Sequence, residues 1–185
     1  MTLASLFAIF TLPTPWSEVH KDWNNHLNVA VAREFENLDR ASDVDEWCPG
    51  YKTLGQDKKV MFWSDLAIWI SFYESSWKPS SVAHEPSPLD VDSVGLFQMA
   101  YKNHMPWCLP DKSNKTLEDP LLSIDCAIPM FGKLIKRDGL LATGDSLKNA
   151  RGLARYWSTV WPKHKFGGHR EDIQQKTREA CVSRW

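Results

Sequence analysis

The hydrophobic positions of this chain recur mostly at steps of three and four residues, the spacing that places side chains on one face of an α-helix. Five expected helices run from about residue 17 to 39, 57 to 76, 119 to 139, 145 to 161 and 170 to 181. The signal for strands is weak, and the proline-rich segment 78–93 favours irregular chain with at most a short hairpin. The sequence therefore predicts a mainly α, α+β single domain with at most a small β-hairpin.

Capping residues sharpen some of these boundaries. Ser17 is the expected N-cap of the first helix and Asp57 a possible cap of the second. Asp119 followed by Pro120 marks the start of the third helix, and Gly139 marks its end. For the fourth helix, Asp145 or Ser146 is the expected cap, and the apolar face would consist of Leu147, Ala150, Ala154, Trp157 and Trp161.

The second helix carries the first candidate for chemistry. Its helical spacing places Trp63, Ala67, Ile70 and Glu74 on one face, so a carboxyl joins an apolar and aromatic stripe. Burial disfavours the ionised form and raises the pKa of such a carboxyl, as a general acid near neutral pH requires. The alternative interpretation is that Glu74 ends a core helix and points into water.

Composition limits the classes of partner. The 185 residues suffice for one domain, and the formal charge is −1, with no basic patch to indicate a nucleic-acid partner. The six histidines show no ligand spacing, so we expect no metal and no cofactor, and we expect a monomer. The ten tryptophans serve a core first, although a few aromatic rings commonly stack on sugars.

The N-terminus resembles the apolar part of a signal peptide. Residues 1–12 are mostly apolar, but this run is too short to span a bilayer as a helix. We therefore assign residues 1–15 to a partial signal-like segment and residues 16–185 to the domain. The alternative is an apolar arm that packs on the fold.

The four cysteines are Cys48, Cys108, Cys126 and Cys181. None forms a Cys-x-x-Cys pair, which argues against zinc, and an even number is typical of an exported, oxidised protein. Of the three possible pairings we favour Cys108–Cys126, which closes a local loop, together with Cys48–Cys181. The alternative is four buried thiols.

A second candidate segment is Ser93-Val94-Gly95-Leu96-Phe97-Gln98-Met99. Gly95 suits a tight backbone position beside a ligand, and Gln98 offers a donor and an acceptor among apolar neighbours. The alternative is a core turn with a surface glutamine.

Together these segments resemble the catalytic domain of soluble lytic transglycosylases, in the lysozyme-like superfamily with goose-type lysozyme. Residues 74–79 (Glu-Ser-Ser-Trp-Lys-Pro) are similar to the catalytic glutamate motif, and residues 93–98 to the family's Ser-x-x-Gly-Leu-(Met or Phe)-Gln, with one residue fewer between the serine and the glycine. Residues 153–157 are similar to its Ala-x-Tyr-Asn motif, except that Trp157 stands where asparagine is common. The resemblance covers roughly residues 57–162 and implies a lysozyme-like fold.

The resemblance implies cleavage of the β-1,4 bond between N-acetylmuramic acid and N-acetylglucosamine in peptidoglycan, with Glu74 as the general acid. In a lytic transglycosylase the 6-hydroxyl of the sugar then closes on C1 and no second carboxylate is needed. In an inverting lysozyme a second carboxylate activates water. Candidates for it are Glu85, Asp90 and Asp92, with Asp90 or Asp92 closest to the goose-type pattern; the alternative is that all three are solvated loop residues.

The remaining site residues also follow from the resemblance. They are expected to bind the glycan or shape its site: Ser75, Ser93, Gly95, Phe97, Gln98 and Tyr156. For Tyr156 a core position stays open as the alternative. An acidic cleft would suit peptidoglycan that carries free amino groups.

The resemblance also implies a location and a rival function. An enzyme of this family would be exported to the periplasm or the extracellular space, without stable insertion in the membrane. The rival is a lysozyme-like module that binds glycan but lacks catalysis, because fold alone does not prove activity.

Overall fold

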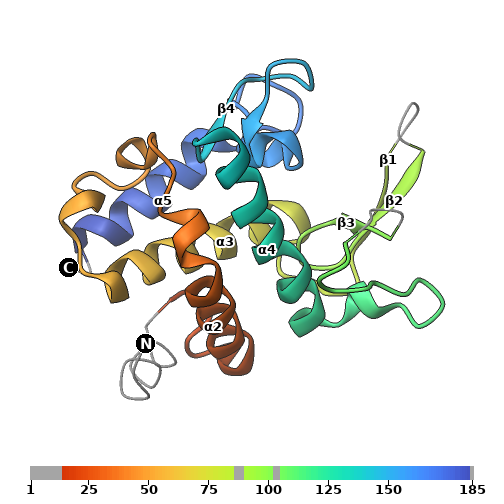
Figure 1. Cartoon of the computed structure of the whole chain (residues 1–185). Helices are drawn as coiled ribbons and strands as arrows, with labels where there is room; N and C mark the ends of the chain where they lie inside the picture. The colour runs from red at the N-terminus through yellow and green to blue at the C-terminus, as the bar shows by residue number, and fades with distance from the viewer. Residues whose placement is uncertain (1–13, 86–89, 102–104, 184–185) are drawn as a thin grey trace.

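A computed structural model describes residues 14–85, 90–101 and 105–183 of the chain (Figure 1). Its α-helices are α2 (Lys21–Leu38), α3 (Gln56–Ser75), α4 (Pro120–Asp138) and α5 (Arg170–Ser183). Single 3-10 turns lie at Val44–Glu46, Tyr51–Thr53, Thr116–Glu118, Leu153–Arg155 and Ser158–Val160. The mainly α architecture that the periodicity predicts is confirmed.

The strands form two small antiparallel sheets. In the first sheet β1 (Val82–Glu85) pairs with β2 (Val91–Val94), and β2 pairs with β3 (Met99–Ala100). In the second, β4 (Ala142–Thr143) pairs with β5 (Arg151–Gly152). The expected hairpin is therefore present in the segment 78–93, and it gains a third strand.

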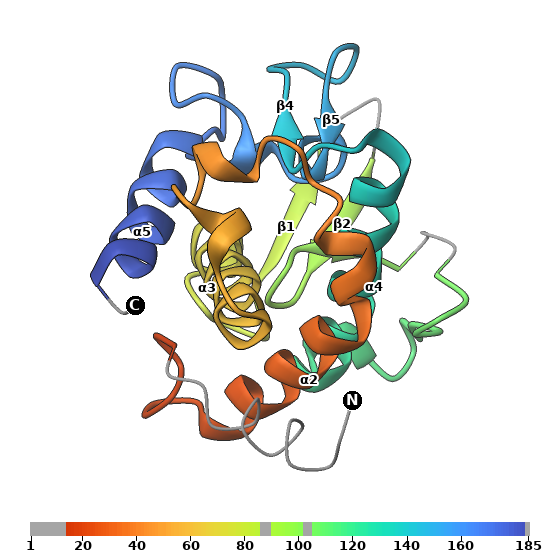
Figure 2. The ribbon, with the colours of Figure 1, turned by 60° about the vertical axis from the view of Figure 1, so that its left-hand side comes forward.

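Helix α3 is the centre of the molecule. Figure 2 shows it nearly end-on, with α5, α2 and α4 around it. Nine consecutive residues, Val60 to Ile68, are all buried, so apolar contact surrounds the helix instead of following one stripe. A helix that is hydrophobic all round is a core helix, and here Glu74 lies in its last turn.

Helix α4 begins and ends as the sequence predicts. The Asp119 carboxylate accepts hydrogen bonds from the backbone N–H groups of Leu121 and Leu122, at 2.8 and 3.0 Å. Gly139 closes the helix in the left-handed conformation at φ 68°. These caps satisfy backbone groups that the helix itself leaves unpaired.

The first helix starts later than expected. Helix α2 begins at Lys21, after His20, and Ser17 is not its N-cap, because the Ser17 hydroxyl accepts a hydrogen bond from the Thr14 backbone N–H. Instead of opening a helix, residues 14–19 form turns that bury Trp16 completely. Its ring lies edge-on to Trp23 at 5.6 Å between centroids.

The prediction of a helix over residues 145–161 is wrong. The connection from β4, strand β5 and two 3-10 turns occupy this segment. The Asn149 side chain accepts hydrogen bonds from the backbone N–H groups of Asp145 and Ser146, and so closes a tight turn. Gly152 then adopts φ +58°, where an added Cβ would lie 2.1 Å from a backbone oxygen of Leu141. Leu147, expected on the apolar face, is 68% exposed.

Both expected disulfides are present. Cys48–Cys181 joins the loop before α3 to α5, and Cys108–Cys126 joins the loop after β3 to α4. Such bonds persist in oxidising compartments. The helices in the described part of the chain include none long and apolar enough to cross a membrane.

The signal-like assignment of residues 1–15 falls mostly on residues 1–13, which lie outside the described residues. Its last two positions belong to the folded body. Thr14 is buried, and its hydroxyl contacts Asn24 of α2.

We expect the two disulfides to contribute unequally to stability. The Cys48–Cys181 bond spans 133 residues and Cys108–Cys126 only 18, so the first restricts the unfolded chain more. Replacing Cys48 and Cys181 by serine should lower the free energy of unfolding by about 5 kcal/mol, against about 3 kcal/mol for Cys108 and Cys126. Urea denaturation of the two double variants measures the difference, and equal losses would contradict the loop-length argument.

Candidate active site

The end of α3 places Glu74 at the edge of the core. Helix α3 stops at Ser75 because Ser76 and Trp77 adopt φ +53° and +59°, before Pro79 could interrupt it. The indole N–H of Trp77 donates back to the carbonyl of Ile68 at 3.0 Å and holds this reversal against the helix. Two successive non-glycine residues with positive φ are uncommon, and such strain concentrates at functional sites.

The carboxyl of Glu74 is enclosed but keeps some access to solvent. Thr159, which is buried, donates a hydrogen bond from its hydroxyl to Glu74 Oε1 at 2.7 Å. Burial raises the pKa of Glu74 to about 7; the Thr159 hydrogen bond opposes this rise, and the negative charge of Glu85 adds to it. Glu74 therefore exchanges a proton near neutral pH, as a general acid must.

The β1–β2 hairpin decides which further acid faces this site. Ala83 lies opposite Ser93 and His84 opposite Asp92, so alternation places Glu85 and Ser93 on one face and His84 and Asp92 on the other. Ser93 donates a hydrogen bond to Glu85 Oε1 at 3.2 Å. Of the three acids singled out in the sequence, Glu85 is the one whose charge acts on Glu74.

Asp90 and Asp92 are engaged elsewhere. Both contact His84, at 3.6 and 3.2 Å, and Asp92 also pairs with Lys112 at 3.6 Å. Their side chains are 83% and 42% exposed. This geometry leaves them outside the arrangement around Glu74, although they were closest to the goose-type pattern.

The segment 93–98 is tied directly to the end of α3. The Ser75 hydroxyl donates to the carbonyls of Ser71 and Leu96, each at 3.0 Å, so this buried residue binds protein and offers nothing to a ligand. Gly95 has φ +80°, and an added Cβ would lie 2.1 Å from the backbone oxygen of Leu117. Glycine is required there by the close approach of protein backbone, where a ligand was expected.

Phe97 is not a sugar platform, since it has no exposed surface. Its ring packs edge-on against Phe131, and its carbonyl accepts the indole N–H of Trp157 at 2.8 Å. Trp157 thus has a structural role at the position where the resembling family commonly has asparagine. Both aromatic residues belong to the core.

Gln98 lies in the turn before β3, and Tyr156, which follows the 3-10 turn Leu153–Arg155, bonds to that strand. The amide nitrogen of Gln98 donates to the carbonyls of Ser81 and Gly95, at 3.1 and 2.9 Å. Its buried Oε1 accepts no hydrogen bond from any described residue. The Tyr156 hydroxyl accepts the Ala100 N–H at 3.1 Å and so fixes β3 beside the site.

Thr159 was not foreseen from the sequence. Nothing local marks it, because its contact with Glu74 spans 85 residues and the segment was expected to be helical. In this arrangement Glu74, held by Thr159, can donate a proton to a leaving oxygen, and Glu85 supplies a second carboxylate whose charge acts on Glu74. The described residues contain no group of three or more His, Cys, Asp or Glu side chains arranged to hold a metal.

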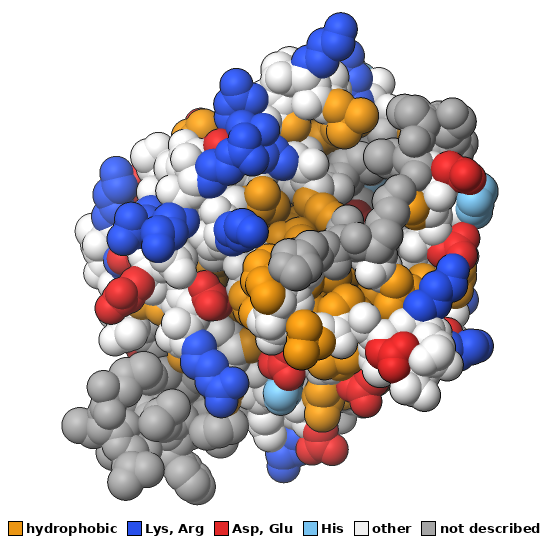
Figure 3. All heavy atoms as spheres, turned by 45° about the vertical axis from the view of Figure 1, so that its right-hand side comes forward, with side chains coloured by type: hydrophobic (Ala, Val, Ile, Leu, Met, Phe, Trp, Pro, Cys, Tyr) orange, Lys and Arg blue, Asp and Glu red, His pale blue; other side chains and the backbone are white. Residues whose placement is uncertain are grey.

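The surface on the side of β1–β3 is apolar in its middle. Figure 3 shows hydrophobic side chains gathered there, with acidic and basic side chains around them. Ligand sites commonly combine an apolar lining with a few polar groups that fix orientation.

Comparison with solved structures identifies the fold. The chain is similar to the wild-type Bd0314 DslA structure with a TM-score of 0.77 and 25% sequence identity, over 93% of this chain and 97% of that one. A Bd0314 DslA variant with a single glutamate-to-glutamine substitution gives a TM-score of 0.78 at 24% identity, with the same coverage. Another such variant is substituted eleven residues further along its chain. No family model matches the sequence, and no curated protein matches it significantly.

We expect Thr159→Val to raise the pKa of Glu74 above its value of about 7. The Thr159 hydroxyl favours the ionised carboxylate, so its removal shifts the titration to higher pH. The measurement is a carbon-13 NMR titration of the Glu74 carboxyl. Thr159→Ser, which keeps a hydroxyl, is the matched control and should stay near the wild type. An unchanged or lowered pKa in Thr159→Val would refute the role of this hydrogen bond.

Glu74→Gln should stabilise the fold at alkaline pH. The pKa of Glu74 is about 7 in the folded chain and 4.5 without the fold, so ionisation destabilises the fold as the pH rises from 4.5 through 7. A neutral side chain avoids this effect, and the gain should be about 3 kcal/mol at pH 8 and absent at pH 4. Urea denaturation at both pH values tests it. A pH-independent difference would mean that the fold does not perturb this carboxyl.

Proposed function

We propose that this protein is a peptidoglycan-cleaving glycosidase of the lysozyme-like superfamily. Its reaction would be cleavage of the β-1,4 bond between N-acetylmuramic acid and N-acetylglucosamine. The observation that carries the proposal is the position of Glu74 in the last turn of the core helix α3, where Thr159 bonds its carboxyl and burial and the charge of Glu85 raise its pKa. Of the three sequence segments that resemble lytic transglycosylases and goose-type lysozymes, the first contains this carboxyl, and the second is bonded to its neighbour Ser75.

Glu74 is the proposed general acid. Its protonated carboxyl would donate a proton to the glycosidic oxygen as the bond to C1 breaks and positive charge develops on the sugar. The Thr159 hydrogen bond fixes the carboxyl and leaves Oε2 for the substrate.

Glu85 makes hydrolysis the favoured branch over anhydro-forming transglycosylation. A lysozyme uses a second carboxylate to activate water or stabilise the developing charge, whereas a lytic transglycosylase needs none. Glu74 and Glu85 are eleven residues apart, as are the two glutamates substituted in the Bd0314 DslA variants. Glu85 replaces Asp90 and Asp92 as the proposed second acid, because those two face His84.

The same arrangement supports the proposal on substrate and location. A second negative charge beside the cleavage site favours glycan with free amino groups, as in deacetylated peptidoglycan. Two disulfides support action outside the reducing cytoplasm, in the periplasm or the extracellular space.

The test is mass spectrometry of the products from native and chemically deacetylated sacculi. We expect reducing ends, faster cleavage of deacetylated sacculi, and losses of activity of about 10²-fold or more for Glu74→Gln and Glu85→Gln. Asp92→Asn, on the opposite face of the same hairpin, is the matched control and should keep full activity.

Each other outcome has a definite meaning. Fragments lighter by one water per cut would mean transglycosylation and remove the role of Glu85. Equal cleavage of both sacculi would refute the substrate preference. An absence of fragments would favour the glycan-binding module that lacks catalysis.

A further inference from the structure

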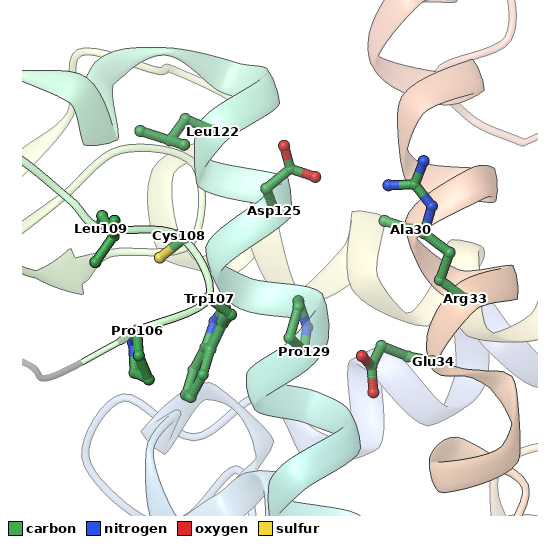
Figure 4. A pocket seen from close by; sticks show the side chains of 10 residues that line it. All are labelled: Ala30, Arg33, Glu34, Pro106, Trp107, Cys108, Leu109, Leu122, Asp125 and Pro129. Atoms are coloured by element: carbon green, nitrogen blue, oxygen red, sulfur yellow. The ribbon is translucent and has the colours of Figure 1, made fainter.

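A pocket of about 410 Å³ lies away from Glu74, over helix α4. Figure 4 shows α4 running between the segment 106–109 and helix α2, whose side chains complete the lining. None of the groups around Glu74 contributes to it. Its volume is in the range of sites that hold small ligands.

One wall of the pocket is rigidly attached to α4. The indole N–H of Trp107 donates to the carbonyl of Cys126 at 3.1 Å, and the adjacent Cys108 forms the disulfide with Cys126. Leu109 then adopts φ +43° and is 75% exposed. An apolar side chain that an uncommon backbone conformation holds exposed to solvent marks a candidate ligand-binding surface.

The opposite wall supplies both signs of charge. Arg33 of α2 is exposed and has no hydrogen bond or ion pair with any described residue. Glu34 lies against Gly132 of α4, where an added Cβ would be 2.3 Å from Glu34 Oε2, and Asn37 donates to the same oxygen at 3.0 Å. The glycine therefore makes room for a half-buried carboxylate inside the pocket.

A second carboxylate belongs to α4. Asp125 accepts a hydrogen bond from, or pairs with, His26 at 2.8 Å, which fixes its orientation. In Figure 4, Asp125 and Glu34 both point into the space between α4 and α2, and Arg33 stands across from Asp125. The pocket thus combines an apolar wall, an unpaired guanidinium and two fixed carboxylates.

We propose that this pocket binds a short peptide that carries both a free carboxylate and a free amino group. Arg33 binds the carboxylate in a charge-assisted pair, and Asp125 and Glu34 receive the amino group. Trp107 and Leu109 cover the small apolar side chains. The identity of the peptide rests on the proposed function: it is the stem peptide attached to N-acetylmuramic acid.

The charges of the pocket favour a peptide over a neutral sugar. A sugar would leave Arg33 without a counter-charge, and one face of the Trp107 ring already lies under Lys133 Nζ, 5.1 Å from its centroid. A purely anionic ligand would meet repulsion from the two carboxylates. A ligand with both charges satisfies each wall.

The experiment is an NMR titration of Glu74→Gln protein with an alanyl-γ-glutamyl-lysine tripeptide. The Trp107 indole N–H signal reports on the pocket directly. We expect saturable shifts of this signal, and an affinity at least about 10-fold weaker in the additional variant Arg33→Gln. Arg40→Gln, just beyond the end of α2, is the matched control and should bind like its parent. A tripeptide with amidated carboxyl groups and an acetylated amine should bind the parent protein no more tightly than the unmodified tripeptide binds Arg33→Gln.

Three results would overturn the proposal. The tripeptide could cause no shift at Trp107, it could bind Arg33→Gln as tightly as the parent protein, or the Trp107 signal could shift with N-acetylglucosamine oligomers and not with the tripeptide. The tripeptide has no glycosidic bond, so the titration does not depend on cleavage. Lysis without tripeptide binding would refute the pocket and leave Glu74 as proposed. Tripeptide binding by a protein that cuts no glycan would support the pocket and refute the proposed role of Glu74.

Discussion

The energetic cost of an ionised carboxyl at the end of α3 governs the arrangement of this molecule. Glu74 lies in the last turn of a core helix, so burial raises the pKa of its carboxyl. The partial negative charge at a helix C-terminus further disfavours ionisation. Thr159 limits these effects by offering the carboxylate a hydrogen bond. The result is a group poised between its two protonation states instead of one locked in the neutral form.

Helix α3 is connected to the first sheet through the residue next to Glu74. The Ser75 hydroxyl donates to the carbonyl of Leu96, and the Gln98 amide donates to the carbonyl of Ser81, so hydrogen bonds connect the turn to the helix end and to the segment before β1. Positive φ at Ser76, Trp77 and Gln98 shows that this junction uses uncommon backbone conformations. Conformations of this kind persist only where surrounding contacts determine them fully, and here those contacts surround the candidate site.

The sequence predicted what depends on local pattern. Periodicity identified α3 and α4, the Asp119-Pro120 and Gly139 signals fixed the ends of α4, and the cysteine spacing favoured the right pairs. The failures have long-range causes. Residues 145–161 show a helical period, but Gly152 must pass close to Leu141, and that contact was invisible in the chain order.

The candidate site divides in the same way. Glu74 was identified from its place on a helix face, whereas Thr159 was missed because its only mark is a contact 85 residues distant. Choosing among Glu85, Asp90 and Asp92 required knowledge of how β1 pairs with β2, and the sequence alone does not give this register. Ser75, Gly95 and Phe97 show that a motif can match a family while its members hold the backbone together.

The pairing of β1 with β2 gives the hairpin a property of its own. A shift of one strand by one residue would exchange its two faces, because successive side chains of a strand point to opposite sides. His84 would then turn toward Glu74, and Glu85 would join the exposed acids on the outside. An insertion or deletion of one residue that shifts this pairing would therefore turn a histidine toward the site in place of a glutamate, without any amino-acid substitution. In related sequences, the length of this hairpin would then help to decide which side chain faces the glutamate at the end of α3.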